Sequence, residues 1–358
     1  MKFWSNKPLS VSNNDTSKLL INTPSLLEAI KKELQNCSIQ LDYTCIPFHS
    51  VNNYTDILNF INKTYDYDDS NFKLHYSEDL IKYFLKENGV LCCFYPKGTT
   101  TLIGLICGSS KDLVVRKQVF KSVEVNFLCL VKQLRNLHVS SYMINVLTKT
   151  CIELFNVQCA FYTIGKQVDP KYFCSKSYYH IPINVHKLNM IDFIKTHYYP
   201  EFKQANLKLE LIENINDKQI HSLYTKLDEF YENKFDIYHK LSYSDFKSTF
   251  NNKAFVHFKD SSNKNYICLY CLDTVNKDKQ CTASNGYLYL YFTDNLFTLL
   301  ESVAYTCQNN DIFDMITLLH DPYLKNKLLL KGTSTLYYYA YNLQLPGIET
   351  KRNGLVTI

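Results

Sequence analysis

The sequence predicts a mixed fold of strands and helices, of the α+β or α/β class. Many apolar runs have strand length and contain β-branched or aromatic residues. Two longer stretches, 139–155 and 294–308, have helical spacing, and each lies between two such runs. The 358 residues include 46% hydrophobic and 20% charged residues. This composition is typical of a globular protein with one large domain or two ordinary ones.

Each half of the chain contains strands and one clear helix. In the first half, the expected helix at 139–155 has apolar side chains every three or four residues. The expected strands there are 89–96, 100–109, 121–131 and 159–165. In the second half, the expected strands are 254–259, 265–273, 286–293, 311–319, 334–343 and 353–358, with the helix 294–308. The least periodic segment is 194–208, so we expect two halves, 1–200 and 201–358.

Composition excludes several classes of function. The net charge of +5 is mild, and there is no Lys/Arg block of the density typical of nucleic-acid binding. Thirteen cysteines lie mostly in apolar runs, which indicates reduced thiols in a cytoplasmic protein. The pair Cys268 and Cys271 has no second pair at metal-binding spacing, so we expect no metal site. No run reaches 18 apolar residues and the start has no long apolar core, so neither a membrane span nor a signal peptide is expected.

The segment from 123 to 140 has the pattern of an anion site. The strand "VEVNFLCLV" leads through the turn "KQLRN" to a helix that opens near His138. Free N–H groups at the start of a helix, with Lys132 and Arg135 nearby, can hold a phosphate. This pattern also occurs in proteins that bind no phosphate, so the residues alone leave the question open.

The same stretch resembles the signature of the N-myristoyltransferases, the glycylpeptide N-tetradecanoyltransferases. Six further pieces resemble motifs of that family and come in its order. They are "KFWSNKP", "DYDDSNFKLHYS", "AFYTIG", "SYYHIPIN", "LYYYAYNL" and "NGLVTI", so the resemblance runs from Lys2 to Ile358.

The resemblance implies an α+β fold with two GNAT-like halves related by pseudo-twofold symmetry. A continuous, saddle-shaped mixed sheet flanked by helices would join them. Residues 1–200 would bind the acyl-CoA and residues 201–358 the peptide, with the C-terminus returning to the active site. The implied reaction moves a tetradecanoyl group from myristoyl-CoA (tetradecanoyl-CoA) to the N-terminal glycine amine of a protein substrate. The enzyme would be a cytoplasmic monomer without a metal.

The resemblance also assigns catalytic roles. Backbone N–H groups at a bulge in Phe127 and Leu128 would stabilise the charge on the thioester oxygen. The carboxylate of Ile358 would accept the proton of the glycine amine, and burial would raise its pKa towards that of the amine. Asn126 and Thr163 would orient the amine. Phe127, Leu128 and Thr163 are alternatively ordinary strand residues.

Two further groups of residues match binding positions of the family. The acyl-CoA group comprises Lys2, Phe3, Trp4, Phe127, Leu128, Cys129, Leu130, Arg135, Asn136, His138, Val139 and Ser140. The peptide group comprises Asp66, Asp68, Asp69, Phe72, Tyr76, Tyr178, His180 and Leu355. Alternatively Trp4 is an N-terminal anchor, the aspartates belong to a solvated loop, and His180 is structural.

The sequence departs from the family pattern at several positions. Asn136, Leu137 and His138 stand where the family has Ser-Lys-Arg, so two cations near the phosphates are missing. Thr317 replaces an Asp and Leu288 a Ser, which alters expected peptide contacts. The alternatives are a transferase for another acyl chain or amine, a catalytically impaired relative that only binds acyl-CoA or peptide, and a likeness of fold alone.

Overall fold

The computed structural model describes residues 26–65, 70–85, 88–157, 159–168, 172–195, 202, 207–345 and 347–356. In the first half the strands are β1 (Leu41–Pro47), β2 (Phe72–His75), β3 (Gly89–Pro96), β4 (Gly104–Val115), β5 (Gln118–Leu130), β6 (Ala160–Ile164) and β7 (Cys174–Pro182). The α-helices are α1 (Leu26–Gln35), α2 (Tyr54–Thr64), α3 (Glu78–Phe84), α4 (Val139–Phe155) and α5 (Val185–Met190). Short 3₁₀ turns are η2 (Phe48–Ser50) and η3 (Lys132–Leu134).

The second half has a similar content. Its strands are β8 (Leu209–Leu211), β9 (Ile237–His239), β10 (Phe255–Asp260), β11 (Tyr266–Cys271), β12 (Asp273–Asn276), β13 (Cys281–Ala283), β14 (Asn285–Phe292), β15 (Met315–His320) and β16 (Leu330–Tyr341). Its helices are α6 (Asp217–Lys234), α7 (Tyr243–Phe250) and α8 (Leu296–Asn310), followed by the 3₁₀ turn η4 (Thr350–Arg352). Among the described residues, no helix is long and apolar enough to cross a membrane.

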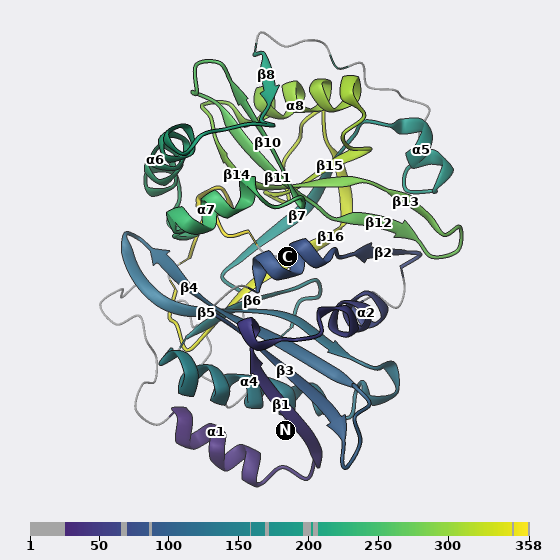
Figure 1. Cartoon of the computed structure of the whole chain (residues 1–358), viewed down its shortest axis with the longest axis vertical. Helices are drawn as coiled ribbons and strands as arrows, with labels where there is room; N and C mark the ends of the chain where they lie inside the picture. The colour runs from purple at the N-terminus through teal and green to yellow at the C-terminus, as the bar shows by residue number, and fades with distance from the viewer. Residues whose placement is uncertain are drawn as a thin grey trace.

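One mixed sheet runs through both halves (Figure 1). In the described part of the chain it has 13 strands in the order β1-β3-β4-β5-β6-β16-β7-β15-β14-β11-β10-β8, and β9 pairs with β4. A small second sheet has the order β13-β12-β2. The α+β class and the large sheet flanked by helices agree with the expectation from the sequence.

The strands are arranged in the same way in the two halves. In each half, antiparallel strands lead to one parallel pair joined through a long helix: β5–α4–β6 in the first and β14–α8–β15 in the second. The next strand then crosses over, because β7 pairs with β15 and β16 pairs with β6. The β16–β7 pair therefore lies at the centre of two halves related by pseudo-twofold symmetry.

Polar residues begin most of the helices. The first N–H groups of a helix lack partners, and a side-chain oxygen at the N-cap accepts from them. Such caps are Asn53, Ser77, Asn184, Asn216, Ser242 and Asn295. Helix α4 differs, because His138 at its N-cap makes no side-chain hydrogen bond to it. The N–H groups at the start of α4 are thus left for another acceptor.

Helix α4 packs its apolar face closely on the sheet. Met143, Val146 and Leu147 belong to a buried cluster with residues of β3, β4 and β5. A Cβ at Gly108 of β4 would lie 2.9 Å from Sγ of Cys151, so a larger residue would push the helix away. This close packing holds the start of α4 in a fixed place relative to β5.

The two halves also share a core on the other face of the sheet. Phe84 of α3 packs among Phe255, Tyr270 and Tyr289 of the second half. The hydroxyls of Tyr83 and Tyr289 are 3.0 Å apart. The same hydrophobic cluster includes residues of α2, α6 and α7. Because apolar residues of both halves are buried together, the halves stabilise each other.

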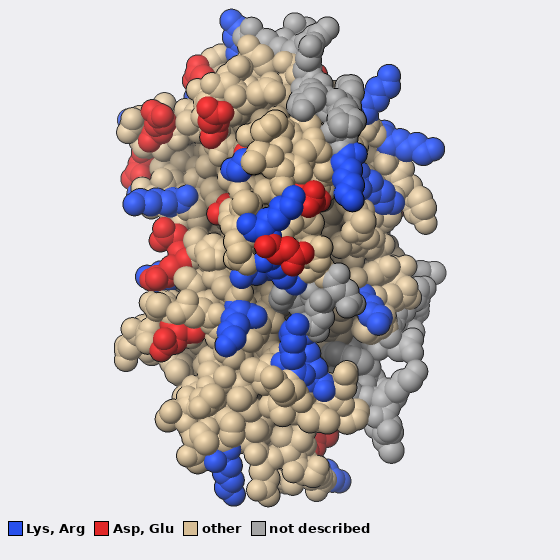
Figure 2. All heavy atoms as spheres, turned by 90° about the vertical axis from the view of Figure 1, so that its right-hand side faces the viewer, with Lys and Arg blue, Asp and Glu red and all other residues tan. Residues whose placement is uncertain are grey.

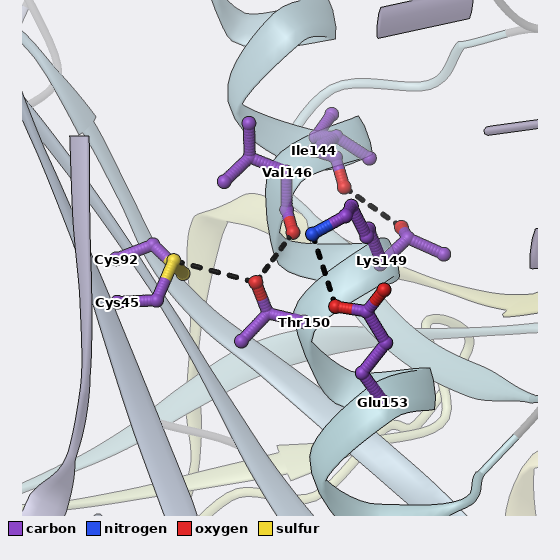
Figure 3. Close-up of a disulfide and its surroundings, with 8 residues drawn as sticks. Cys45, Cys92, Ile144, Val146, Lys149, Thr150 and Glu153 are labelled. Carbon is purple, nitrogen blue, oxygen red and sulfur yellow. Dashed lines mark hydrogen bonds and ion pairs between the residues drawn. A yellow bond between two sulfur atoms is a disulfide. The ribbon is translucent and has the colours of Figure 1, made fainter. Parts of the chain in front are cut away.

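The prediction that all cysteines are free thiols is wrong for two of them. Cys45 and Cys92 lie opposite each other in the antiparallel pairing of β1 and β3, with Cα atoms 4.1 Å apart, and form a disulfide. Figure 3 shows Thr150 of α4 donating to Sγ of Cys45 (3.3 Å) and to the carbonyl of Val146 (2.9 Å). The other eleven cysteines are free, and most are buried.

The predicted helices and most predicted strands are confirmed with shifts at some ends, and the closing strand is not. The helix expected at 139–155 is α4, and that expected at 294–308 is α8. The strand expected at 100–109 begins only at Gly104 and continues to Val115. The closing strand expected at 353–358 is wrong for 353–356, where Asn353 makes a single bridge to Ile237. There the Asn353 side chain accepts from the N–H of Leu355, which turns the backbone locally.

Candidate active site

A bulge interrupts β5 at Phe127 and Leu128. On β4, Leu105 pairs with Cys129 and Cys107 with Asn126, so two residues of β5 stand opposite Ile106 alone. Phe127 has a φ of 51°, in the left-handed region that few residues with a Cβ adopt. Its ring is buried against Tyr65 and Tyr76, whereas the Leu128 side chain is 39% exposed. A bulge takes its extra residue out of the ladder and turns backbone groups to new directions.

The bulge lies where β5 separates from β6. These parallel strands pair only at Val123↔Ala160 and Glu124↔Phe161. In the part of the chain that the structure describes, no further strand pairs with that side of β5. In the described residues, the backbone around Phe127 thus faces a gap in the strand pairing.

Asn126 and Thr163 lie beside this gap. Each is two residues beyond the paired position Glu124↔Phe161, so both project to the same face of the sheet. Asn126 is buried, and its side chain interacts with the Glu124 carboxyl. Glu124 lies on that face too, and burial raises the pKa of its carboxyl although Lys111 and the Asn126 side chain lower it. The face therefore presents polar groups inside the fold.

The start of α4 lies beyond the same strand. Asn136 and His138 have positive φ, which turns the chain sharply between β5 and the helix. His138 is exposed. Arg135 donates from Nε to the carbonyl of Leu130 (3.1 Å) and from Nη2 to that of Thr64 (3.1 Å). Its guanidinium ties the end of α2 to β5, while the uncapped helix start keeps the geometry of an anion site.

On the second-half side, a hydrogen-bonded chain runs through β7, β15 and β14. His180 Nδ1 and Thr317 Oγ1 are 2.9 Å apart, and Thr317 Oγ1 donates to Oδ1 of Asn285 (2.9 Å). Burial lowers the pKa of His180 to about 4. Phe193 packs edge-on against the His180 ring. The histidine is thus neutral and held in one orientation.

A hollow lies between this region and the end of the chain. It is lined by Tyr270 and Tyr287, by Thr317, and by Asn353 to Val356. Val356 packs against the cluster that contains Phe127 and Tyr76. The hollow and the β5 bulge therefore border the same hydrophobic cluster, the hollow through Tyr231, Tyr270 and Tyr289.

The comparisons with known proteins agree with this arrangement. Residues 20–174 match the family described as myristoyl-CoA:protein N-myristoyltransferase, N-terminal domain. The chain is 23% identical over its whole length to the glycylpeptide N-tetradecanoyltransferase of Plasmodium falciparum, covering 93% of it. It is 23% identical to the type 2 enzyme of Bos taurus, with 99% of this chain and 76% of the relative covered. Residues 20–174 therefore resemble the N-terminal domain of the N-myristoyltransferases.

A solved structure of the family has the same fold. The Saccharomyces cerevisiae N-myristoyltransferase with bound myristoyl-CoA superposes with a TM-score of 0.81 at 19% identity. The superposition covers 100% of this chain and 99% of the yeast chain. This likeness extends over both halves, including the second half that lies outside the matched family domain.

Part of the predicted site lies outside the described residues. The residues concerned are Lys2, Phe3, Trp4, Asp66, Asp68, Asp69 and Ile358. Their predicted roles stay predictions. The described candidates around the bulge, from Asn126 to Leu130, and those from Arg135 to Ser140 lie along one continuous segment.

The predicted peptide residues come from both sheets. Phe72 lies on β2, and Tyr76 directly follows that strand with its side chain buried. Tyr178 and His180 lie on β7, two residues apart and hence on the same face of the strand. Leu355 is buried in a separate cluster with residues of β4, β6, β7 and β16. Whether these residues contact a peptide stays a prediction.

Sequence reasoning missed two polar residues of this site. Lys176 on β7 is buried beside the end of the chain, and Glu124 is buried on β5. Both stand in alternating strand patterns where a charged residue normally points to solvent, and the sequence carried no sign that these faces would be covered. In the described residues, no group of His, Cys, Asp or Glu could hold a metal ion.

Proposed function

We propose that the chain transfers a tetradecanoyl group from tetradecanoyl-CoA to the N-terminal glycine amine of a protein. The observation that carries the proposal is the bulge at Phe127, with its positive φ, at the point where β5 leaves β6. Acyl transfer needs aimed hydrogen-bond donors at the thioester oxygen, and a bulge beside a gap supplies main-chain N–H groups there.

The reaction proceeds by direct attack. The amine nitrogen bonds to the thioester carbonyl carbon, the C–S bond breaks, and coenzyme A leaves as a thiol once it has taken up a proton. The N–H groups of Phe127 and Leu128 stabilise the developing negative charge, a contribution of about 2.7–4 kcal/mol for a donor of this kind. A thiol nucleophile is not required, and burial raises the pKa of the neighbouring Cys129 to about 12.

The proton of the amine goes to the carboxylate of Ile358. A substrate amine with a pKa of about 8 is mostly protonated at neutral pH and must lose a proton before it attacks. Asn126 and Thr163, which share one face of the sheet, orient the amine. The tail up to Val356 lines a hollow together with residues of β14 and β15, which supports this role for the end of the chain.

The two substrates occupy different surfaces. The uncapped start of α4 and the turn at Asn136 to Ser140 bind the phosphates of coenzyme A, while Lys2, Phe3 and Trp4 cover it. Asp66 and Asp68 attract basic residues of the peptide, whose first residues lie among Phe72, Tyr76, Tyr178, His180 and Leu355. Neutral His180 adds no positive charge that would repel such a peptide.

The test is transfer of labelled tetradecanoate from its CoA ester to two peptides that differ only in Gly or Ala at the first position. We expect label on the Gly peptide and on no other. A series of acyl-CoA esters with roughly 8 to 18 carbons, around the 14 expected, is tested in the same assay. A preference for another length would identify a transferase for another acyl chain. No label with any ester would contradict the proposal.

One observation favours a second candidate, a relative that binds acyl-CoA without turnover. The Arg135 guanidinium donates to the carbonyls of Leu130 and Thr64. These donors, which were expected to bind the phosphates, thus stabilise the fold instead. Adding one residue after Ile358 distinguishes the two. The enzyme loses most of its turnover and keeps its affinity for acyl-CoA, whereas a binding protein shows no turnover before or after the change.

A further inference from the structure

The end of the chain is fastened to the segment that joins α6 to β9. The N–H of Asp236 donates to the carbonyl of Arg352 (2.8 Å), and that of Gly354 donates to the carbonyl of Ile237 (2.8 Å). The Arg352 guanidinium donates twice to Oδ1 of Asp236, at 3.1 and 2.7 Å. These contacts hold one side of the tail and leave its other side towards β7.

A buried lysine holds that other side. Lys176 Nζ donates to the carbonyl of Asn353 (2.7 Å) and, at 3.4 Å, to that of Leu355. The side chain is 7% exposed, and Nζ lies 5.5 Å from the centroid of the Tyr338 ring. Among the described residues, no carboxylate forms an ion pair with it. The ammonium is directed at the main chain of the tail.

The surroundings leave Lys176 charged at neutral pH. Burial lowers its pKa to about 8, and Cys174 on the same strand opposes that shift. His320 on β15 also faces the ammonium, and burial lowers the pKa of this histidine, with Lys176 adding to the effect. A charged donor makes a stronger hydrogen bond to a carbonyl than a neutral one does.

The sheet register connects Lys176 with the proposed catalytic face. On β16, Leu336 pairs with Lys176 and Tyr338 with Cys174, while Tyr338 pairs on its other side with Thr163. Directly opposite residues project to the same face, as do residues two apart on one strand. Lys176, Tyr338 and Thr163 thus share one face of the central strands.

We propose that Lys176 is a positioning residue that fixes the end of the chain against this face by binding the carbonyls of Asn353 and Leu355. It thereby sets the point from which the last residues extend to the substrate amine. This role deepens the proposed function and rests on it for its effect on turnover. A buried lysine directed at two carbonyls of one segment restrains that segment along its length, which apolar packing of Leu355 alone does not.

The first experiment measures how firmly the tail is bound to the rest of the protein and needs no assay of turnover. Lys176→Met keeps the bulk of the side chain and removes its donors. Lys226→Met is the matched control, because Lys226 donates to a backbone carbonyl, that of Asn263 (2.7 Å), away from the tail. Each protein is treated with a carboxypeptidase, and release of its last residues is followed by mass spectrometry.

We expect Lys176→Met to release its last residues about tenfold to 150-fold faster than wild type, the equilibrium equivalent of one lost charge-assisted hydrogen bond. Lys226→Met should match wild type. Equal rates in all three proteins overturn the proposal, whatever the outcome for turnover. If Lys176→Met does not fold, by circular dichroism, Lys176→Gln keeps one donor group and serves in its place.

The second experiment separates positioning from a merely structural role. We expect kcat of Lys176→Met to fall by a similar factor, with the Kd for tetradecanoyl-CoA unchanged, and Lys176→Gln to recover part of kcat. A loss of acyl-CoA affinity equal to the loss of kcat, or an unchanged kcat despite a released tail, overturns the catalytic part. Absence of turnover in wild type refutes the proposed function and leaves the carboxypeptidase result standing by itself.

Discussion

Replacing Gly354 with alanine tests whether the tail must lie flat against the end of α6. Gly354 is the point of closest approach, where its N–H donates to the carbonyl of Ile237. An added Cβ would lie 2.6 Å from Cγ and from Cδ2 of Phe235. Carbon atoms in contact normally stay about 3.5–4.0 Å apart, so the tail or the ring must move by roughly 1 Å.

The ring has little room to move. Phe235 is buried, with the ring centroids of Tyr231 and Phe230 at 4.9 and 6.3 Å and that of Tyr291 at 6.5 Å. Overpacking at a site of this kind costs about 1–3 kcal/mol. The same free energy corresponds to a roughly fivefold to 150-fold shift of an equilibrium between attached and detached tail.

Two measurements read out this free energy. Urea unfolding gives the free energy of unfolding, and labelled transfer to a Gly-first peptide gives kcat. We expect Gly354→Ala either to lose about 1–3 kcal/mol of stability or, where the tail detaches instead, to lose turnover about fivefold to 150-fold with the core unchanged. Gly347→Ala is the control on the same segment, since nothing lies within 4 Å of its Cβ position.

The reasoning is refuted if Gly354→Ala matches Gly347→Ala in both stability and kcat. That result would mean that the tail does not need its close contact with Phe235. The position of Gly354 to Val356 along the hollow would then affect neither stability nor turnover.

Three further predictions concern the rest of the fold. Unfolding in denaturant without a reductant should expose eleven titratable thiols, and a count of thirteen would disprove the disulfide. Reduction of Cys45–Cys92 should lower the free energy of unfolding by about 2–4 kcal/mol. Burial lowers the pKa of His257 from about 6.5 to about 4, so the unfolded chain binds more protons between these pH values and stability is lost as the pH falls through them. This residue contributes about 3 kcal/mol to that loss, and the slope of stability against pH should flatten in His257→Gln if the histidine is responsible. Phe127→Ala should cost about 3–5 kcal/mol, measured by urea unfolding, because its ring is buried between Tyr65 and Tyr76; a loss below about 1 kcal/mol would mean that the bulge is not held by this ring.

The electrostatic surface agrees with the expectation from composition. Figure 2 shows one face of the molecule on which basic and acidic side chains are interspersed among uncharged areas. Acidic side chains lie mainly along the left edge of this view, and several basic side chains lie together at its upper right.

Sequence patterns identified α4, α8 and many strands, but they missed elements of all lengths, among them the 18-residue helix α6 and the nine-residue strand β7. Helix α4 has its predicted bounds because its apolar spacing, and the sharp turns before and after it, are local properties. Short strands such as β8, β9 and β13 have three residues each and were not predicted. Three residues carry too little pattern to identify a strand, and these form only because a neighbouring edge is available.

The residues of the site also differ in whether a local pattern could identify them. The motif around Asn126 to Leu128 could be read from the sequence because it is contiguous, and its bulge lies at the expected residues. Lys176 could not be found in this way, because its partners Asn353 and Leu355 are about 180 residues away, with separations of 177 and 179. No local pattern distinguishes a buried lysine from one that points to solvent on a strand face.

The sequence by itself determined the α+β class, the resemblance to the N-myristoyltransferases, the βαβ segment around α4 and the residues of the bulge. All of these depend on neighbours along the chain. The tertiary structure alone decided that β7 and β16 change halves, that Cys45 meets Cys92, and that the tail lies between Lys176 and Asp236. The physical reason is that pairing at long separation depends on which apolar faces are buried together, and many pairings satisfy the same local pattern.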